Sequence, residues 1–127
     1  MLVLIATPIF LIYLTFSNST DCDQLVIDTY ELHSNINIPK VDYVNCYFDK
    51  SLNTRISVYD LNGFIDLKDF KVVNTSKAGY LRGLNLLSED EQPQHTNLYL
   101  ASGERWGTKW TYAVDSRTNR LWAELSY

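Results

Sequence analysis

The residues of this chain that could do acid–base chemistry gather in one polar run, SEDEQPQHTN. In it, Glu89, Asp90 and Glu91 precede His95 by a few positions, and a carboxylate beside an imidazole is a pairing that general acid–base catalysis uses. The alternative is a solvated surface loop, which is typical of a polar run between apolar segments. Neither His95 nor His33 has a partner that the sequence identifies, so we expect the loop and no catalytic dyad.

Motifs that carry other reactions are missing from the sequence. It has no Gly-x-Ser-x-Gly nucleophile elbow, no pair of histidines one helical turn apart and no phosphate-binding glycine loop. Two histidines and two distant cysteines are too few for a metal site. The net charge of -4 argues against binding nucleic acid. We therefore expect no enzyme, no metal and no cofactor.

The last stretch, KWTYAVDSRTNRLWAELSY, predicts a β-hairpin in one register. A loop from Ser116 to Asn119 puts six apolar residues on one face and opposes polar residues on the other, and a slip by one residue would scatter both sets. The expected pairs are Val114 with Leu121, Tyr112 with Ala123, Trp110 with Leu125, Asp115 with Arg120 and Thr111 with Glu124.

Two Trp–Arg combinations are candidate contact residues for a protein partner. In the expected register Trp122 lies on the polar face near Arg120, and an outward Trp beside Arg is typical of a binding hot spot. The alternative is that a neighbouring strand or the N-terminal helix covers Trp122. Upstream, ASGERWGTKW places Arg105 and Trp106 in a Gly-flanked loop, where the Trp either contacts a partner or folds back onto the core. The expected partner-binding residues are Arg105, Trp106, Arg120 and Trp122.

The segment ASGERW resembles the Ser-Gly-x-Arg-aromatic loop of the bacterial envelope lysozyme inhibitors. Those are small β-barrel proteins, often lipid-anchored, that insert the loop into a lysozyme active site. The resemblance covers Ala101 to Trp106, with Trp106 where that family prefers Tyr. The chain lacks the family's Lys-Gly pair on the following strand, and its Cys spacing differs. The resemblance implies an inhibitor of a lysozyme-like hydrolase.

The chain opens with an apolar segment that predicts export. Leu2 to Phe16 holds no charged residue and would span about 22 Å as a helix, the length of a signal-peptide core. Ser17 and Ser19 are small residues of the kind that a signal peptidase reads, with a cut after Ser19. Extended through Thr20, the segment is long enough for a membrane anchor. We favour an anchor in the inner membrane with the domain in the periplasm; cleavage would release it there.

The two cysteines, Cys22 and Cys46, are expected to form a disulfide. An even number of cysteines in an exported domain is typical of such a bond. Closing a loop of about 25 residues would contribute on the order of 3 kcal/mol to stability.

The rest of the chain predicts one mainly β domain over residues 21–127, following the signal anchor or signal peptide of residues 1–20. We expect a short helix within 21–38, although Tyr30, Leu32, Ile36 and Ile38 alternate like a strand. The segment VDYVNCYFD reads as a strand, and TRISVYDLNGFIDLKDFKVV as two strands around an Asn62-Gly63 turn. In all we expect a β-rich α+β fold, an antiparallel meander of about seven strands that is barrel-like or a curved sheet.

The expected function is therefore binding and not catalysis. The first hypothesis is a membrane-anchored protein-binding module of the bacterial envelope. It would be an immunity or inhibitor protein against a toxin or lysozyme-like hydrolase, or an accessory subunit of a membrane complex. The second is a lipocalin-like barrel that binds a small apolar ligand as the periplasmic part of a membrane sensor, and it requires an apolar cavity of about 300 Å³ or more.

Overall fold

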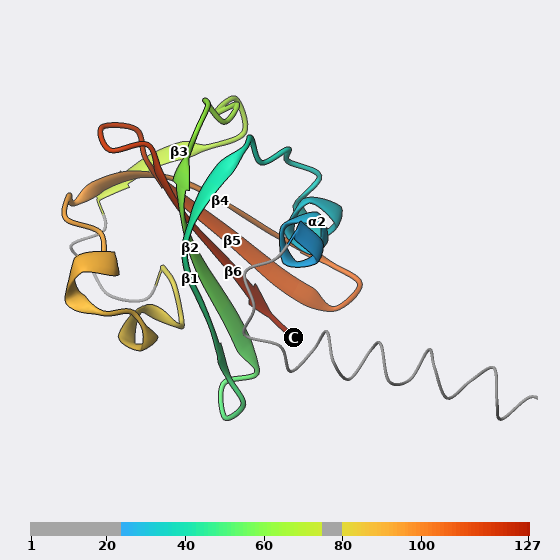
Figure 1. Cartoon of the computed structure of the whole chain (residues 1–127). Coiled ribbons are helices and arrows are strands. Elements are labelled where there is room, and N and C mark those ends of the chain that lie inside the picture. The colour runs from blue at the N-terminus through green and yellow to red at the C-terminus, as the bar shows by residue number, and fades with distance from the viewer. Residues whose placement is uncertain (1–23, 75–79) are drawn as a thin grey trace, which may run out of the picture.

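One antiparallel sheet dominates the computed structural model, which describes residues 24–74 and 80–127 (Figure 1). Beside the sheet lie the helix α2 (Gln24–Ser34) and two short 3-10 helices, η1 (Leu84–Leu86) and η2 (Glu89–Glu91). The strands of the described ranges are β1 (Val41–Asp49), β2 (Thr54–Leu61), β3 (Lys71–Asn74), β4 (Asn97–Arg105), β5 (Thr108–Asp115) and β6 (Arg120–Ser126). The predicted mainly β fold with one short helix is confirmed.

The order of the strands across the sheet is β1-β2-β6-β5-β4-β3. The sheet is open, with β1 and β3 at its two edges, so the curved sheet and not the closed barrel is the form observed. The C-terminal strand β6 lies in the middle, between β2 and β5. The chain is therefore no simple meander, because it crosses from β2 to the far edge before it returns strand by strand.

The predicted hairpin at Asn62-Gly63 is wrong. β2 pairs with β1 and β6, whereas β3 pairs with β4. The reason lies in the β5–β6 turn, whose Asn119 side chain donates hydrogen bonds to the carbonyl oxygens of Leu61 at 3.1 Å and Gly63 at 2.8 Å. These bonds seat β6 beside β2, so no strand that follows Gly63 can pair there.

The register of β5 and β6 is the one that the sequence predicts, with Val114 opposite Leu121 and Asp115 opposite Arg120. The predicted strand over VDYVNCYFD is also confirmed as β1. The six apolar residues of the hairpin belong to one hydrophobic cluster, in which Trp110 is partly buried and the other five are buried. The register that places the apolar residues on one face of the hairpin and pairs the polar residues on the other is therefore the one found in the folded protein.

Both faces of the sheet are covered. On one face, Tyr30 of α2 packs into the cluster and its hydroxyl lies 2.8 Å from Ser57 Oγ on β2. On the other face, Leu81 and Leu87 from the segment 80–96 pack against Trp122 and neighbouring strand residues. Seven of the eight residues of β2 are buried for this reason, since a strand covered on both faces has no face turned to solvent.

Three sequence predictions fall on residues 1–23, which lie outside the described residues: the apolar anchor, the cut after Ser19, and the bond of Cys22 to Cys46. Cys46 itself is buried on β1, and no described cysteine is a free thiol. The pairing with Cys22 stays a prediction. Within residues 24–74 and 80–127, no helix is both long and apolar enough to cross a membrane.

Candidate functional site

The turn between β4 and β5 presents Trp106 to solvent. Arg105 pairs with Thr108, so Trp106 and Gly107 alone form the turn, with φ angles of 54° and 77°. Positive φ at both central residues is the geometry of the tight turn that matches the twist of a hairpin. A non-glycine residue in this region costs about 1 kcal/mol, and yet the turn holds a Trp that is 66% exposed. Strain of this kind tends to be retained where a side chain serves a function.

Two other side chains hold the exposed indole in place. The Arg105 guanidinium carbon lies 4.3 Å from the centroid of the Trp106 ring, and the His33 ring meets it edge-on at 5.6 Å. Arg105 also donates from Nη1 to the carbonyl oxygen of Leu32 at 2.7 Å. The end of α2 and the β4–β5 turn therefore form one unit, which we call the tip cluster: Leu32, His33, Arg105 and Trp106.

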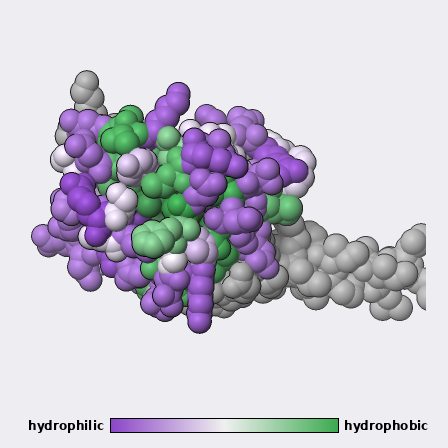
Figure 2. Space-filling model, turned by 90° about the horizontal axis from the view of Figure 1, so that it is seen from above, coloured by the Kyte–Doolittle hydropathy of each residue, from purple (hydrophilic) through white to green (hydrophobic). Residues whose placement is uncertain are grey.

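Phe64 is another large exposed apolar side chain, but it is not held in this way by the described residues. Phe64 is 91% exposed, and no ring or cation–π contact with a described residue fixes it. Figure 2, seen from above, shows apolar side chains in the middle of that face with hydrophilic ones around them. The remaining exposed positions in the described ranges are Leu32, Val72, Val73 and Tyr127. Trp106 stands out because it is both exposed and ordered by its neighbours.

Trp122 lies elsewhere than the first hypothesis required. It is 1% exposed, and its Nε1 donates to the carbonyl oxygen of Glu91 at 2.7 Å. The covering element is the segment 80–96, which is neither of the two elements that the sequence suggested. A buried indole cannot contact a partner while this segment is in place, so Trp122 is removed from the expected contact residues.

Arg120 is committed to contacts within the protein. Its Nε donates to Asp60 Oδ1 at 2.7 Å and its Nη1 to the carbonyl oxygen of Asp90 at 2.9 Å. β5 has eight residues and would span about 25 Å, and Arg120 lies beyond its far end from Trp106. The structure therefore brings Arg105 and Trp106 together and leaves Arg120 and Trp122 apart from them.

The polar run of residues 88–97 is no freely solvated loop, since Glu91 anchors it to the sheet. The Glu91 carboxylate is buried and accepts hydrogen bonds from the Tyr47 hydroxyl at 2.6 Å and from the Ser88 backbone at 2.9 Å. Burial raises the pKa of Glu91, but these hydrogen bonds outweigh it and hold the pKa below its ordinary value. The same bond to the carboxylate raises the pKa of Tyr47 to about 12.

We expect Glu91→Gln to lower the free energy of unfolding by about 1–2 kcal/mol near pH 7, because charge-assisted hydrogen bonds become neutral ones. The folded pKa of Glu91 is depressed, so its contribution is present above the unfolded pKa and is lost as the pH falls through the folded pKa. Urea unfolding at several pH values should show the two proteins converging in acid. Glu89→Gln, at an exposed position, is the control. A gap that widens as the pH falls would contradict the assignment.

A second buried carboxylate, Glu124 on β6, fixes the start of the covering segment. Its Oε1 accepts from the backbone N–H of Arg82 at 3.0 Å and its Oε2 from that of Gly83 at 2.7 Å. Burial raises the pKa of Glu124, and the two backbone bonds offset part of this effect. Glu124 thus binds the segment 80–96 from β6, Glu91 joins the same segment to the sheet, and this segment covers the face of β6 that carries Trp122.

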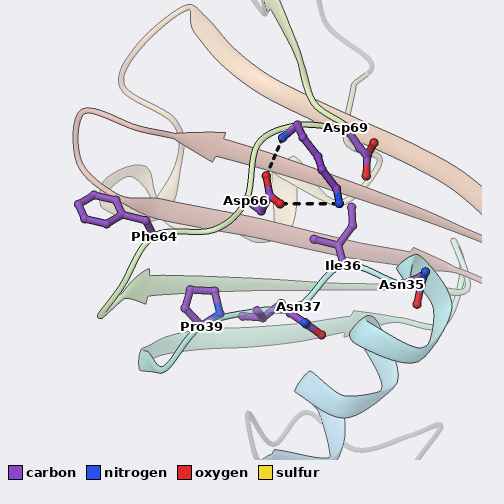
Figure 3. A pocket seen from close by; sticks show the side chains of 9 residues that line it. Asn35, Ile36, Asn37, Pro39, Phe64, Asp66 and Asp69 are labelled. Atoms are coloured by element: carbon purple, nitrogen blue, oxygen red, sulfur yellow. Dashed lines mark hydrogen bonds and ion pairs between the residues drawn. The ribbon is translucent and has the colours of Figure 1, made fainter.

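Hollows remain at the surface of the described part of the chain. One, of about 280 Å³, lies between residues 35–39 and 64–69; in Figure 3 the Phe64 ring points away from the other labelled side chains. Its one ion pair, Lys68 to Asp66 at 3.9 Å, joins two well-exposed side chains and contributes little. Another, of about 370 Å³, lies between the segment 88–96 and the β5–β6 turn and includes Asp115 and Arg120.

His95, for which the sequence identifies no partner, lies near a carboxylate in the structure. His95 Nε2 lies 3.7 Å from Asp115 Oδ2, a pairing across twenty positions that no spacing rule identifies. No group of three or more His, Cys, Asp or Glu side chains in the described ranges could hold a metal ion.

Comparison with protein-family models, curated proteins and solved structures finds no match to this chain.

Proposed function

We propose that this domain is a protein-binding module and that the tip cluster is its contact surface. The supporting observation is that Trp106 is 66% exposed and yet fixed by a strained turn, by Arg105 and by His33. An aromatic side chain ordered before binding loses little conformational entropy on contact, and Trp with Arg is typical of residues that dominate binding energy. The module would work in the periplasm, anchored by residues 1–20 or released by cleavage after Ser19.

Protein binding is favoured over an enclosed apolar ligand. The sheet is open, and the apolar side chains of both faces pack against α2 or against the segment 80–96. The hollow of about 370 Å³ described above lies open at the surface and includes the charged side chains of Asp60, Asp115 and Arg120 in its lining. A lipid-binding or sterol-binding barrel would instead require an enclosed apolar cavity.

The shape of the tip favours an inhibitor over an accessory subunit. A two-residue turn with an aromatic side chain at its apex fits a concave surface such as the substrate cleft of an envelope hydrolase or toxin. A subunit of a stable complex would instead present a broad apolar face. We therefore propose an immunity or inhibitor protein against a toxin or lysozyme-like hydrolase, with the accessory-subunit role as the second form of the same binding function.

Site-specific crosslinking tests the contact surface directly. A photoreactive phenylalanine analogue is placed at position 106, or at position 64 as the control, in the full chain in the cells that produce it. We expect one discrete protein adduct from position 106 and none of the same size from position 64. Equal adducts from both positions, or none from position 106, would show that the tip is not the contact surface.

Once the partner is identified, Trp106→Ala is expected to weaken its binding about 30-fold, the effect of losing a hot-spot residue worth about 2 kcal/mol. Phe64→Ala removes a smaller but more exposed aromatic side chain and should leave the affinity unchanged. Titration calorimetry of the two variants makes the comparison. If both lose the same affinity, the binding is not specific to the tip.

A further inference from the structure

The hollow beside the β5–β6 turn, far from the tip cluster, has one-sided hydrogen-bonding chemistry. It measures about 370 Å³ and is lined by residues that include Asp60, Gln92, Gln94, Asp115 and Arg120. We call it the acceptor cleft. Its β5–β6 turn lies at the opposite end of the hairpin from the β4–β5 turn (Figure 1).

Most side-chain donors in the wall of the acceptor cleft are already used, although the Thr118 hydroxyl also lines it. The Gln92 amide nitrogen donates to the carbonyl oxygens of Leu84 and Leu87, and that of Gln94 to those of Glu89 and Gln92. All three guanidinium nitrogens of Arg120 donate inside the protein. What these side chains leave for a ligand is therefore mainly acceptor oxygen: the amide oxygens of the two glutamines and the Asp60 carboxylate, whose side chain is 46% exposed.

The Asp115 carboxylate is the deepest of these acceptors. It is 2% exposed, and its Oδ1 accepts both hydrogen bonds from Arg117, at 3.0 and 3.4 Å. Its Oδ2 has only an ion-pair contact with His95 Nε2, at 3.7 Å, which is too long for a hydrogen bond. Oδ2 is not one of the fully buried side-chain atoms without a partner in the described ranges; it borders the acceptor cleft, where a donor that enters the cleft can reach it.

The charge around the acceptor cleft is mainly negative, which also favours a cationic donor. The adjoining hollow is lined by Glu89 and Asp90 and shares Gln94 with the cleft. A hydrogen bond from Ser88 lowers the pKa of Asp90, which keeps its carboxylate charged near neutral pH. These carboxylates, with those of Asp60 and Asp115, outnumber the guanidinium groups of Arg117 and Arg120, so a cation is drawn to this end of the molecule.

We propose that the acceptor cleft binds a cationic hydrogen-bond donor, an ammonium or guanidinium group, which completes the shell of Asp115 Oδ2 and the glutamine oxygens. A guanidinium group suits it best, because its planar donors reach several acceptors at once. The group belongs either to a free small amine or to a Lys or Arg side chain of a partner protein. This proposal does not rest on the function of the tip cluster.

Titration of the full chain in detergent micelles tests the proposal. The probes are arginine amide, a neutral peptide with one central Arg, and acetate as an anionic control, and the Trp122 indole N–H is followed by NMR. We expect saturable shifts with both cationic probes and none with acetate. Tighter binding of the peptide would assign the group to a protein side chain, and equal binding to a free amine.

Two variants make the assignment specific. Asp115→Asn keeps an acceptor for Arg117 and turns the Oδ2 position into a donor, so we expect at least tenfold weaker binding of arginine amide. Gln94→Leu removes an acceptor at an exposed position and should weaken binding several-fold without disturbing the fold, which covers the case in which Asp115→Asn does not fold. Asp66→Asn, in the other hollow, should bind as the unaltered chain does. Non-saturable shifts, an equal response to acetate, or full affinity in Gln94→Leu would overturn the proposal.

Discussion

Replacing Trp122 with alanine is expected to lower the free energy of unfolding by about 4 kcal/mol, the usual range for a large aromatic residue removed from a core. Trp122 is 1% exposed and packs among Ile56, Val58, Leu98 and Ala113. Its loss would leave a cavity under the segment 80–96 and free the Glu91 carbonyl oxygen that accepts from the indole. Urea unfolding of the full chain, followed by fluorescence, measures the change.

Trp106→Ala is the matched control, since the same substitution at a 66% exposed site should cost less than about 1 kcal/mol. Trp122→Phe is an intermediate change, because it keeps one aromatic ring but loses the donor to Glu91 and the second ring of the indole. We expect it to cost about 1–2 kcal/mol. If Trp122→Ala were as mild as Trp106→Ala, then Trp122 would not be buried in solution.

Replacing either cysteine with serine is the second large effect expected. If Cys22 and Cys46 are bonded, Cys22→Ser and Cys46→Ser should each lower the free energy of unfolding by about 3 kcal/mol, because both open the same loop of about 25 residues. Reduction of the unaltered chain should lower it by a similar amount. Unfolding with and without a reducing agent measures all three.

The two variants also distinguish a disulfide from two thiols. Cys46 is buried on β1, so Cys46→Ser would be destabilising even without a bond. Cys22→Ser would then have little effect, and reduction would have none. That outcome would remove the disulfide and, with it, one of the two arguments for an exported domain.

Local pattern was sufficient where a segment carries its own constraints. The β5–β6 register could be predicted because apolar and charged pairs agree on a single pairing over the whole hairpin. β1 could be predicted because VDYVNCYFD is a strand-forming run that follows Pro39. The position of Trp106 in an exposed turn next to Arg105 could also be predicted, since Gly107 directly follows Trp106.

Other features depend on contacts between distant segments. Leu32 and His33 could not be joined to Trp106 from the sequence, because α2 docks on the sheet more than seventy residues away along the chain. The sequence predicts a solvated run over 88–97, because nothing in the spacing of its three acidic residues indicates that Glu91 is buried. The sequence TRISVYDL does carry a weak sign that both faces of β2 are covered. Ile56 and Val58 are apolar on one face, and Tyr59 and Leu61 are apolar on the other.

The amino-acid sequence by itself determined the β-rich class, the C-terminal hairpin and the aromatic turn, because propensity, alternation and turn chemistry act over a few residues. Only the tertiary structure decided that β6 lies beside β2, that the segment 80–96 covers Trp122, and that acceptor oxygens converge at the β5–β6 turn. These depend on which distant surfaces bury each other. Such a choice is made by the free energy of the whole fold and leaves little trace in any short stretch of residues.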